Sequence, residues 1–231
     1  SYALHRYADY SAKVLESQFK GMLLKINQSE VWTQMLGEFN AYNILAIYAT
    51  AQLLGHDELE SLKFISQLNS VPGRFQTFEA PDKIMIVVDY AHTPDALKNV
   101  LMTINKLRTQ NESLITVVGC GGNRDQEKRP KMGGIAAEYS TKVIFTSDNP
   151  RDEDPDSIID QMSEGVDPVD FKKTMSVTRR KEAIKVACQL SQPGDVVLIA
   201  GKGHENYQEI KGEKLPFDDY QIAKDIFSKT P

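Results

Sequence analysis

Charged residues and glycines gather in four short polar segments, each of which directly follows an apolar run. These segments are residues 89–94, 119–125, 147–155 and 201–205. The third, SDNPRDEDP, contains Arg151, whose planar guanidinium is suited to hold a carboxylate through two parallel hydrogen bonds. Asn-Pro and clusters of aspartate are also ordinary turn chemistry. The segment is therefore both a turn and a candidate binding loop.

Segment 119–125, GCGGNRD, adds a second arginine, Arg124, to a glycine-rich loop. Glycine has no Cβ and lets the backbone approach a ligand closely. The spacing matches neither GxGxxG nor a P-loop, so the loop predicts no dinucleotide or phosphate fingerprint. Arg124 and Arg151 together are suited to clamp a carboxylate. The alternative is that they are surface arginines paired with Asp125 and Asp152.

Three further polar residues follow the ends of apolar runs. Glu205 closes the GKGHE segment, which lacks the Ser or Thr of a P-loop, and it either binds an ammonium group or is a solvated loop acid. Asp89 either accepts hydrogen bonds from a ribose or simply ends its strand. His92 either packs against a base or caps the turn. The residues alone indicate a cleft for a small zwitterionic or phosphorylated ligand.

The composition excludes several classes of protein. The chain has 231 residues, of which 41% are hydrophobic and 26% charged, with a formal net charge of −5, as in an ordinary globular protein. Lysine and arginine are scattered, so no nucleic-acid partner is expected. The four histidines and two cysteines lack ligand spacing, so no protein metal site is predicted. Without an 18-residue apolar run or a signal peptide, we expect a cytoplasmic location with no membrane association. We also expect a monomer.

Strand and helix patterns alternate along the second part of the chain. The apolar runs 83–89, 114–118, 142–146 and 195–200 are typical of strands buried on both faces. Repeated βα units predict a mostly parallel, twisted sheet with helices on both faces. Ligands of such sheets bind at the carboxyl ends of the strands, where the four polar segments begin. A helix is predicted to start at Thr93-Pro94, with Leu97, Val100, Leu101 and Ile104 at helical spacing. Further helices are predicted over 129–139, 156–163 and 179–190, with a short strand near Met175.

The first part of the chain follows a different pattern. Short apolar stretches within residues 1–40 predict strands of a sheet edge or hairpin. Asn40 is the expected cap of a buried helix that ends at Gly55, and a second helix follows from Asp57. The Pro72-Gly73 turn is the predicted boundary. The predicted domains are residues 1–70 and 71–231.

Six motifs stand out along the chain. They are GEFNAYN (37–43), VPGRFQ (71–76), VDYAHTPDALKNVL (88–101), GCGGNRDQEKRPKMG (119–133), SDNPRDEDP (147–155) and AGKGHENYQ (200–208). Taken together, they resemble the Mur ligases, the ATP-dependent amide-forming enzymes of peptidoglycan precursor synthesis. They occur in the family's order, cover most of residues 37–220, and are most similar to those of members that add meso-diaminopimelate.

The resemblance implies an α/β protein whose residues 71–231 form the family's Rossmann-like, amino-acid-binding C-terminal domain. Residues 1–70 would be the C-terminal part of its central ATP-binding domain. The family's P-loop and N-terminal uridine-nucleotide domain match no part of the chain, so we expect a fragment that is inactive alone. In the family, ATP and Mg²⁺ serve to convert UDP-MurNAc-L-Ala-D-Glu to an acyl phosphate, which the amine of meso-diaminopimelate attacks.

The resemblance also implies roles for particular residues. The amino-acid site would comprise the DNPR residues Asp148, Asn149, Pro150 and Arg151 together with Arg124, Gly201 and Glu205. The ATP-contacting positions would be Asn43, Arg74, Asp89 and His92. Lys13 matches the lysine that is carbamylated in the family and helps to hold Mg²⁺.

Two alternatives remain at this point. The first is a ligase of the same family that adds L-lysine, against which Arg151 argues because a lysine side chain has no second carboxylate for a guanidinium to hold. The second is a non-catalytic module that only binds an amino acid or a nucleotide. A ligase similar to folylpolyglutamate synthetase would share the architecture but is not expected to carry DNPR.

Overall fold

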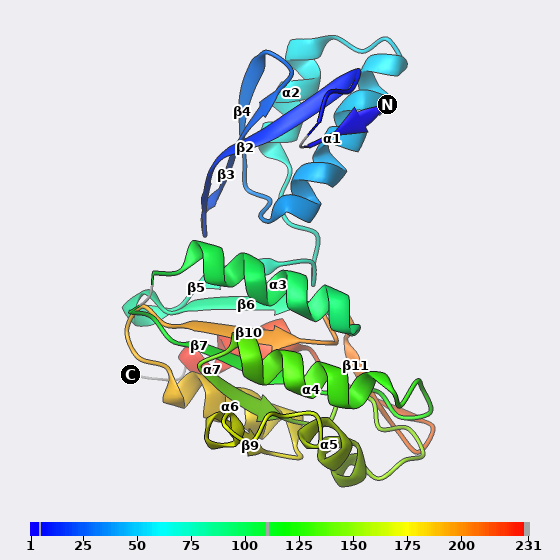
Figure 1. The fold of residues 1–231 in the computed structure, drawn as a ribbon, viewed down its shortest axis with the longest axis vertical. Helices are drawn as coiled ribbons and strands as arrows, with labels where there is room; N and C mark the ends of the chain where they lie inside the picture. The colour runs from blue at the N-terminus through cyan, green and yellow to red at the C-terminus, as the bar shows by residue number, and fades with distance from the viewer. Residues whose placement is uncertain (5, 110, 229–231) are drawn as a thin grey trace. The chain divides into compact units, whose positions relative to one another are not determined.

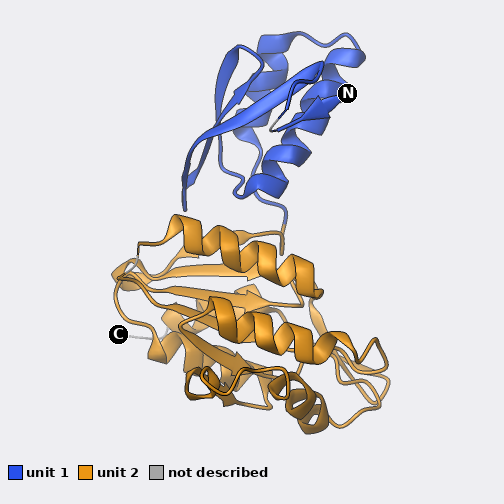
Figure 2. Cartoon of the chain, in the orientation of Figure 1, with its two compact units in different colours: residues 1–71 blue, residues 72–231 orange. Residues whose placement is uncertain are grey.

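The computed structural model of the chain describes residues 1–4, 6–109 and 111–228. The chain divides into two compact units, residues 1–71 and residues 72–231, which Figure 2 shows in blue and orange. Each unit has its own sheet and its own buried apolar cluster. We therefore describe each by itself.

The first unit is a four-stranded sheet packed against two helices. The strand order is β1-β2-β3-β4, with β1 parallel to β2 and the other pairs antiparallel. Met22, Leu24 and Ile26 of β3 and Ile44 and Leu45 of α1 are fully buried in its core. The elements are β1 (Tyr2–Ala3), β2 (Tyr10–Gln18), β3 (Gly21–Ile26), β4 (Ser29–Thr33), α1 (Glu38–Leu53) and α2 (Glu58–Gln67).

The start of α1 differs from the prediction. The cap position is Gly37, with φ of 91°, and Asn40 lies inside the first turn, where its Nδ2 donates to the Leu36 carbonyl at 2.7 Å. The left-handed conformation of Gly37 turns the chain into the helix three residues earlier than a capping Asn40 would. Asp57 does cap α2, because its Oδ1 accepts from the Glu60 amide at 2.9 Å.

The second unit is the predicted α/β domain with a mostly parallel sheet. Its strand order is β5-β6-β10-β7-β8-β9, and only the β5–β6 pair is antiparallel. The strands are β5 (Gln76–Glu79), β6 (Met85–Asp89), β7 (Leu114–Val118), β8 (Lys142–Phe145), β9 (Thr174–Ser176) and β10 (Val196–Ala200). The helices are α3 (Pro94–Leu107), α4 (Lys128–Tyr139), α5 (Pro155–Ser163), α6 (Arg180–Leu190) and α7 (Asp219–Ser228).

The strand β5, the helix α7 and a hairpin of this unit were not predicted. The hairpin consists of β11 (Tyr207–Ile210) and β12 (Glu213–Pro216), whose sequences YQEI and EKLP lack the alternation of apolar and polar residues that predicts a strand. The first predicted strand is shorter than expected, since Pro81–Lys83 forms a 3-10 turn before β6. A second such turn, Phe171–Lys173, precedes β9.

The sheet lies between two layers of helices. Helices α3 and α4 cover one face and α6 and α7 the other (Figure 1). The central strand β10 is buried throughout, as are β6 and β7 beside it. Ala200 of β10 is paired in register with Asp89 of β6 and Val118 of β7, so these three strands end at the same edge. The loops that follow them must meet there.

Helix α3 follows the predicted pattern from its cap to its buried face. Thr93 Oγ1 accepts from the Ala96 amide at 3.3 Å, and Pro94 occupies the first helical position. Leu97, Val100, Leu101 and Ile104 are the buried residues of the helix. In the described part of the chain, no helix has the length and apolar character needed to cross a membrane.

Candidate functional site

A pocket of about 480 Å³ lies at the carboxyl ends of β6, β7, β8 and β10. Residues from all four predicted polar segments line it, which confirms that these segments meet in space. Its volume is in the range of small-molecule sites. The lining includes Tyr90, His92, Gly119, Arg124, Asp148, Asn149, Arg151, Gly201, Glu205 and Tyr207.

Both predicted arginines line this pocket. Arg124 is exposed, and its Nη1 donates to the Asn123 carbonyl at 3.1 Å. Arg151 is more buried; its Nε donates to Glu209 Oε2 at 3.1 Å and its Nη1 to the Gly122 carbonyl at 2.8 Å. In the described residues, neither arginine pairs with the aspartate that follows it. The alternative of local surface ion pairs is therefore wrong.

Asn149 and Glu205 form a connected polar group with Lys202. Asn149 Nδ2 donates to Glu205 Oε2 at 2.8 Å, and Lys202 Nζ donates to Asn149 Oδ1 and Glu205 Oε2 at 2.9 and 3.1 Å. Lys202 is fully buried, so its charge depends on Glu205 for compensation. Glu205 is thus neither a purely solvated acid nor an unpartnered one. It faces the pocket with one oxygen already engaged by the protein.

The backbone of this edge leaves little room for side chains. Gly201 has φ of 116°, and a Cβ there would lie 2.9 Å from Asp148 Oδ2. A Cβ on Gly122 would lie 1.9 Å from the Pro150 carbonyl oxygen. The loops after β7, β8 and β10 are therefore in contact, and glycine is required at these points of close approach. Asp148 lines the pocket together with the two arginines, whereas Pro150 does not and lines the second hollow described below.

Two of the three predicted nucleotide residues of this unit, Arg74 and His92, lie close to Tyr90, and the third, Asp89, precedes Tyr90 in the chain. The Arg74 guanidinium lies 4.9 Å from the centre of the Tyr90 ring, and the His92 ring centre lies 4.5 Å from it. His92 Nδ1 is 2.9 Å from the Tyr90 carbonyl oxygen. The His204 ring lies 5.2 Å away on the same tyrosine. Tyr90, which the sequence did not single out, is the centre of this group.

Asp89 is the buried acid of this group. Its Oδ2 accepts from the Phe75 amide at 2.7 Å, and the carboxyl is 5% exposed. Burial raises its pKa to about 6, against the opposing effects of that hydrogen bond and of the Arg74 charge. A carboxyl that titrates near neutrality beside an aromatic and cationic group is a reasonable acceptor for a polar ligand.

Lys13 and Asn43 belong to the first unit, whereas all residues that line the pocket belong to the second. Lys13 is an exposed residue of β2, paired in register with Lys25 of β3. Asn43 is exposed on α1, with its Nδ2 3.5 Å from Asn40 Oδ1. No cluster of three metal-binding side chains, counting His, Cys, Asp and Glu, occurs among the residues that the structure describes.

Two buried arginines form hydrogen bonds to the segments that border the site. The sequence analysis assigned no role to either. Arg129 of α4 is fully buried and donates to both oxygens of Glu153, at 2.8 and 2.9 Å, and to the Gly121 carbonyl at 3.3 Å. The hydrogen bond from Arg129 lowers the pKa of Glu153. Glu153 therefore joins α4 to the loop after β8, and is more than an acidic residue that precedes a helix. Arg180 is paired with Asp219.

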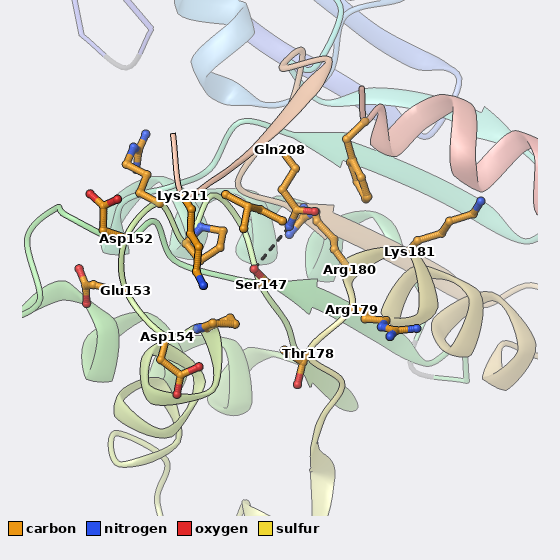
Figure 3. A pocket seen from close by; sticks show the side chains of 15 residues that line it. Ser147, Asp152, Glu153, Asp154, Thr178, Arg179, Arg180, Lys181, Gln208 and Lys211 are labelled. Atoms are coloured by element: carbon orange, nitrogen blue, oxygen red, sulfur yellow. Dashed lines mark hydrogen bonds between the residues drawn. The ribbon is translucent and has the colours of Figure 1, made fainter. Parts of the chain in front are cut away.

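A second hollow of about 600 Å³ lies on the other side of loop 147–155 (Figure 3). It is bounded by that loop, the start of α6 and the hairpin residues Gln208, Ile210 and Lys211. Gln208 Nε2 donates to Ser147 Oγ at 3.4 Å and to the Asp148 carbonyl at 2.6 Å. The hairpin is thus joined to the candidate binding loop.

Residues 73–203 match the family model described as "Mur ligase, glutamate ligase domain". The chain is 52% identical over 226 residues to the UDP-N-acetylmuramoyl-L-alanyl-D-glutamate–2,6-diaminopimelate ligase of Cytophaga hutchinsonii, a match that covers 98% of this chain and 46% of that protein. A solved structure of a ligase with the same name has 39% identity and a TM-score of 0.70, over 98% of this chain and 47% of that one.

A folylpolyglutamate synthase from Thermotoga maritima also has a similar structure. Its TM-score is 0.64 at 17% identity, over 96% of this chain and 47% of that one, which is a likeness of fold alone. The chain spans about half the length of the curated relatives that it matches.

Proposed function

Because the chain belongs to the Mur ligase family, we propose that it is the amino-acid-binding part, with part of the ATP site, of a ligase that adds meso-diaminopimelate to UDP-MurNAc-L-Ala-D-Glu. Residues 72–231 would bind and orient the incoming amino acid. Residues 1–71 would contribute to the ATP-binding domain. The observation that carries the proposal is the convergence of Arg124, Arg151 and Glu205 on one pocket.

The charges of the pocket fit an amino acid with two zwitterionic ends. Arg151 would hold one carboxylate through Nη2, which donates to no acceptor in the described part of the chain. Arg124, whose side chain has one hydrogen bond within the described residues, to the Asn123 carbonyl, would hold the second. Glu205 and the adjacent loop carbonyls would accept from an ammonium group. Orienting the reacting amine is the main contribution that such a site makes to rate.

The group around Tyr90 fits a nucleotide. An aromatic ring with a guanidinium beside it suits stacking of a base, and Asp89 is a candidate acceptor for ribose hydroxyls. We propose Arg74, Asp89 and His92 as ATP contacts, with Asn43 of α1 as a further one. ATP supplies the phosphoryl group that activates the carboxylate of the acceptor substrate. We expect the whole enzyme in the cytoplasm, where ATP is available.

Mg²⁺ would accompany the nucleotide. This ion usually keeps several waters and takes phosphate oxygens plus one or two protein ligands, so it needs no three-residue protein cluster.

Lys13 is proposed as the carbamylated lysine of the family. Its exposed position on β2 leaves the amine accessible for that modification. Carbon-13 NMR of the chain in 13C-labelled bicarbonate should show a carbamate carbon signal that is absent from Lys13→Ala.

Calorimetry of the 231-residue chain with meso-diaminopimelate, L-lysine and an Arg151→Ala variant tests the amino-acid assignment. We expect weak binding of meso-diaminopimelate, much weaker binding of L-lysine, and loss in the variant by about tenfold or more, since a charge-assisted pair contributes about 1.5–3 kcal/mol. Similar affinities for both ligands would favour a lysine-adding ligase. Equal heats in all three experiments would reject the site.

A non-catalytic binding module is the second candidate, and the length of the chain favours it for these residues in isolation. The chain covers 43–47% of the curated relatives named with it, and no segment of the chain matches the P-loop that cradles phosphates. We therefore expect the isolated chain to bind ligand without ligating it. Measurable ATP-dependent amide formation by these residues alone would contradict this expectation.

A further inference from the structure

We propose that Glu209, in the β11–β12 hairpin, is a positioning residue that holds the Arg151 side chain ready for a ligand carboxylate. The inference rests on the function proposed above, because it assigns a support to the arginine of that site. Glu209 lies 58 residues after Arg151 in the sequence, in an element that the sequence patterns did not predict.

The hairpin holds the backbone of Arg151 as well as its side chain. Arg151 has φ of 52°, a left-handed conformation that residues other than glycine rarely adopt. Its amide donates to the Glu209 carbonyl at 3.1 Å, and its carbonyl accepts from the Lys211 amide at 2.8 Å. These bonds form an isolated parallel bridge between Arg151 and Ile210. The hairpin therefore stabilises an unusual turn at the binding arginine.

The side chain of Arg151 is held at two of its three nitrogens. Nε donates to Glu209 Oε2 and Nη1 to the Gly122 carbonyl. Among the described residues, Nη2 has no protein acceptor. The guanidinium is planar, so fixing the other two nitrogens also fixes the direction in which Nη2 points.

The side chain of Arg151 borders open space. Arg151 lines both the 480 Å³ pocket and the 600 Å³ hollow behind loop 147–155, in which Lys211 is also seen (Figure 3). Its side chain is therefore bordered by open space on two sides and is 18% exposed. On the sides that face these hollows, the orientation of the guanidinium depends on its hydrogen bonds, and Glu209 provides the one that carries a countercharge.

Glu209 has two opposing effects on a ligand carboxylate. Its negative charge weakens the attraction of that carboxylate to Arg151, while its hydrogen bond removes rotamer freedom that binding would otherwise have to remove. Because the pair is partly solvated, its charge is screened, and we expect the positioning effect to exceed the charge effect. The two effects can be separated, since glutamine keeps an acceptor for Nε without the charge and alanine keeps neither.

The test is to measure the affinity for meso-diaminopimelate by calorimetric titration of the native 231-residue chain and of Glu209→Gln and Glu209→Ala. Glu213→Ala is the control, because Glu213 is an exposed residue of the same hairpin. We expect Glu209→Ala to weaken binding about three- to tenfold, the cost of ordering one long side chain. Glu209→Gln and Glu213→Ala should remain within about twofold of the native chain. Equal or tighter binding in Glu209→Ala would overturn the proposal.

A ligand-free measurement separates this proposal from the proposed function. In NMR spectra of the native chain, the Arg151 Nε–Hε group, assigned by its absence from Arg151→Lys, should show restricted motion and slow exchange with water. Glu209→Ala should abolish both, and Glu209→Gln should largely retain them, while the backbone amide of Lys211 stays protected in every variant. A rigid Arg151 Nε–Hε in Glu209→Ala would reject the role of Glu209. If Arg151 Nε–Hε is mobile in Glu209→Ala but the native chain binds no meso-diaminopimelate, the role of Glu209 holds and the proposed ligand is rejected instead.

Discussion

Arg180 and Asp219 form an ion pair in which both side chains are fully buried. Arg180 Nε and Nη2 donate to the two carboxylate oxygens of Asp219 at 2.8 and 2.7 Å, and Nη2 also donates to the Ala200 carbonyl at 3.0 Å. The Asp219 charge helps to raise the pKa of Arg180 against the opposing effect of burial. The pair joins α6, α7 and the end of β10, and so supports the edge of the sheet where the pocket lies.

Removing Asp219 should be strongly destabilising. Arg180 Nη1 already lacks a partner in the described residues, and Asp219→Ala would leave the buried guanidinium without its ion-pair partner. We expect a loss of about 3–5 kcal/mol in the free energy of unfolding of residues 72–231, measured by hydrogen exchange at the amides of β10. Asp225→Ala, at an exposed position of the same helix, should change it by less than about 0.5 kcal/mol. A loss below about 1 kcal/mol in Asp219→Ala would show that the pair is not structurally important.

Gly201→Ala should damage the site through both strain and a clash. The residue has φ of 116°, and its new Cβ would lie 2.9 Å from Asp148 Oδ2. We expect destabilisation of about 1–3 kcal/mol and weaker binding of meso-diaminopimelate, because Asp148 must move. Gly212→Ala is the matched control: φ is 81° but nothing lies within 4 Å of the Cβ position. It should cost about 1 kcal/mol of stability and leave ligand affinity unchanged. Equal effects of both variants on affinity would contradict the clash.

Asp89 should make the second unit less stable as the pH rises from about 4 to about 6. The pKa of its carboxyl is about 6 in the folded chain against a usual 3.8, so the folded state binds the proton more tightly than the unfolded state in this range. Ionising the buried carboxyl lowers the free energy of unfolding by about 3 kcal/mol, and this loss is complete once the pH is well above 6. Asp89→Asn keeps an acceptor for the Phe75 amide and removes the titration.

The stability of Asp89→Asn relative to the native chain should therefore rise by about 2–3 kcal/mol between pH 4 and pH 7. Hydrogen exchange at the β6 amides over this pH range measures the difference. A constant difference would indicate that Asp89 titrates alike in the folded and unfolded states.

Residues close in sequence determined most of the fold that could be predicted. The β-branched runs at 114–118 and 196–200, and the Thr93-Pro94 start of α3, specify their elements through side-chain periodicity and local capping. Because parallel strands end at one edge, the order of strands and polar loops was also enough to predict that Arg124, Arg151 and Glu205 would line one pocket.

The partners of those residues were decided only by the tertiary structure. Glu209 meets Arg151 across 58 residues, and Arg180 meets Asp219 across 39, so neither pair leaves a periodic or local signal. The same holds for Lys202, whose place between two glycines suggested a loop, while its ammonium is fully buried between Asn149 and Glu205. The types and spacing of the binding residues could be recognised from the sequence, because they depend only on which residues follow each strand. Their burial, charge balance and orientation arise from contacts between distant segments, which exist only once the sheet has formed.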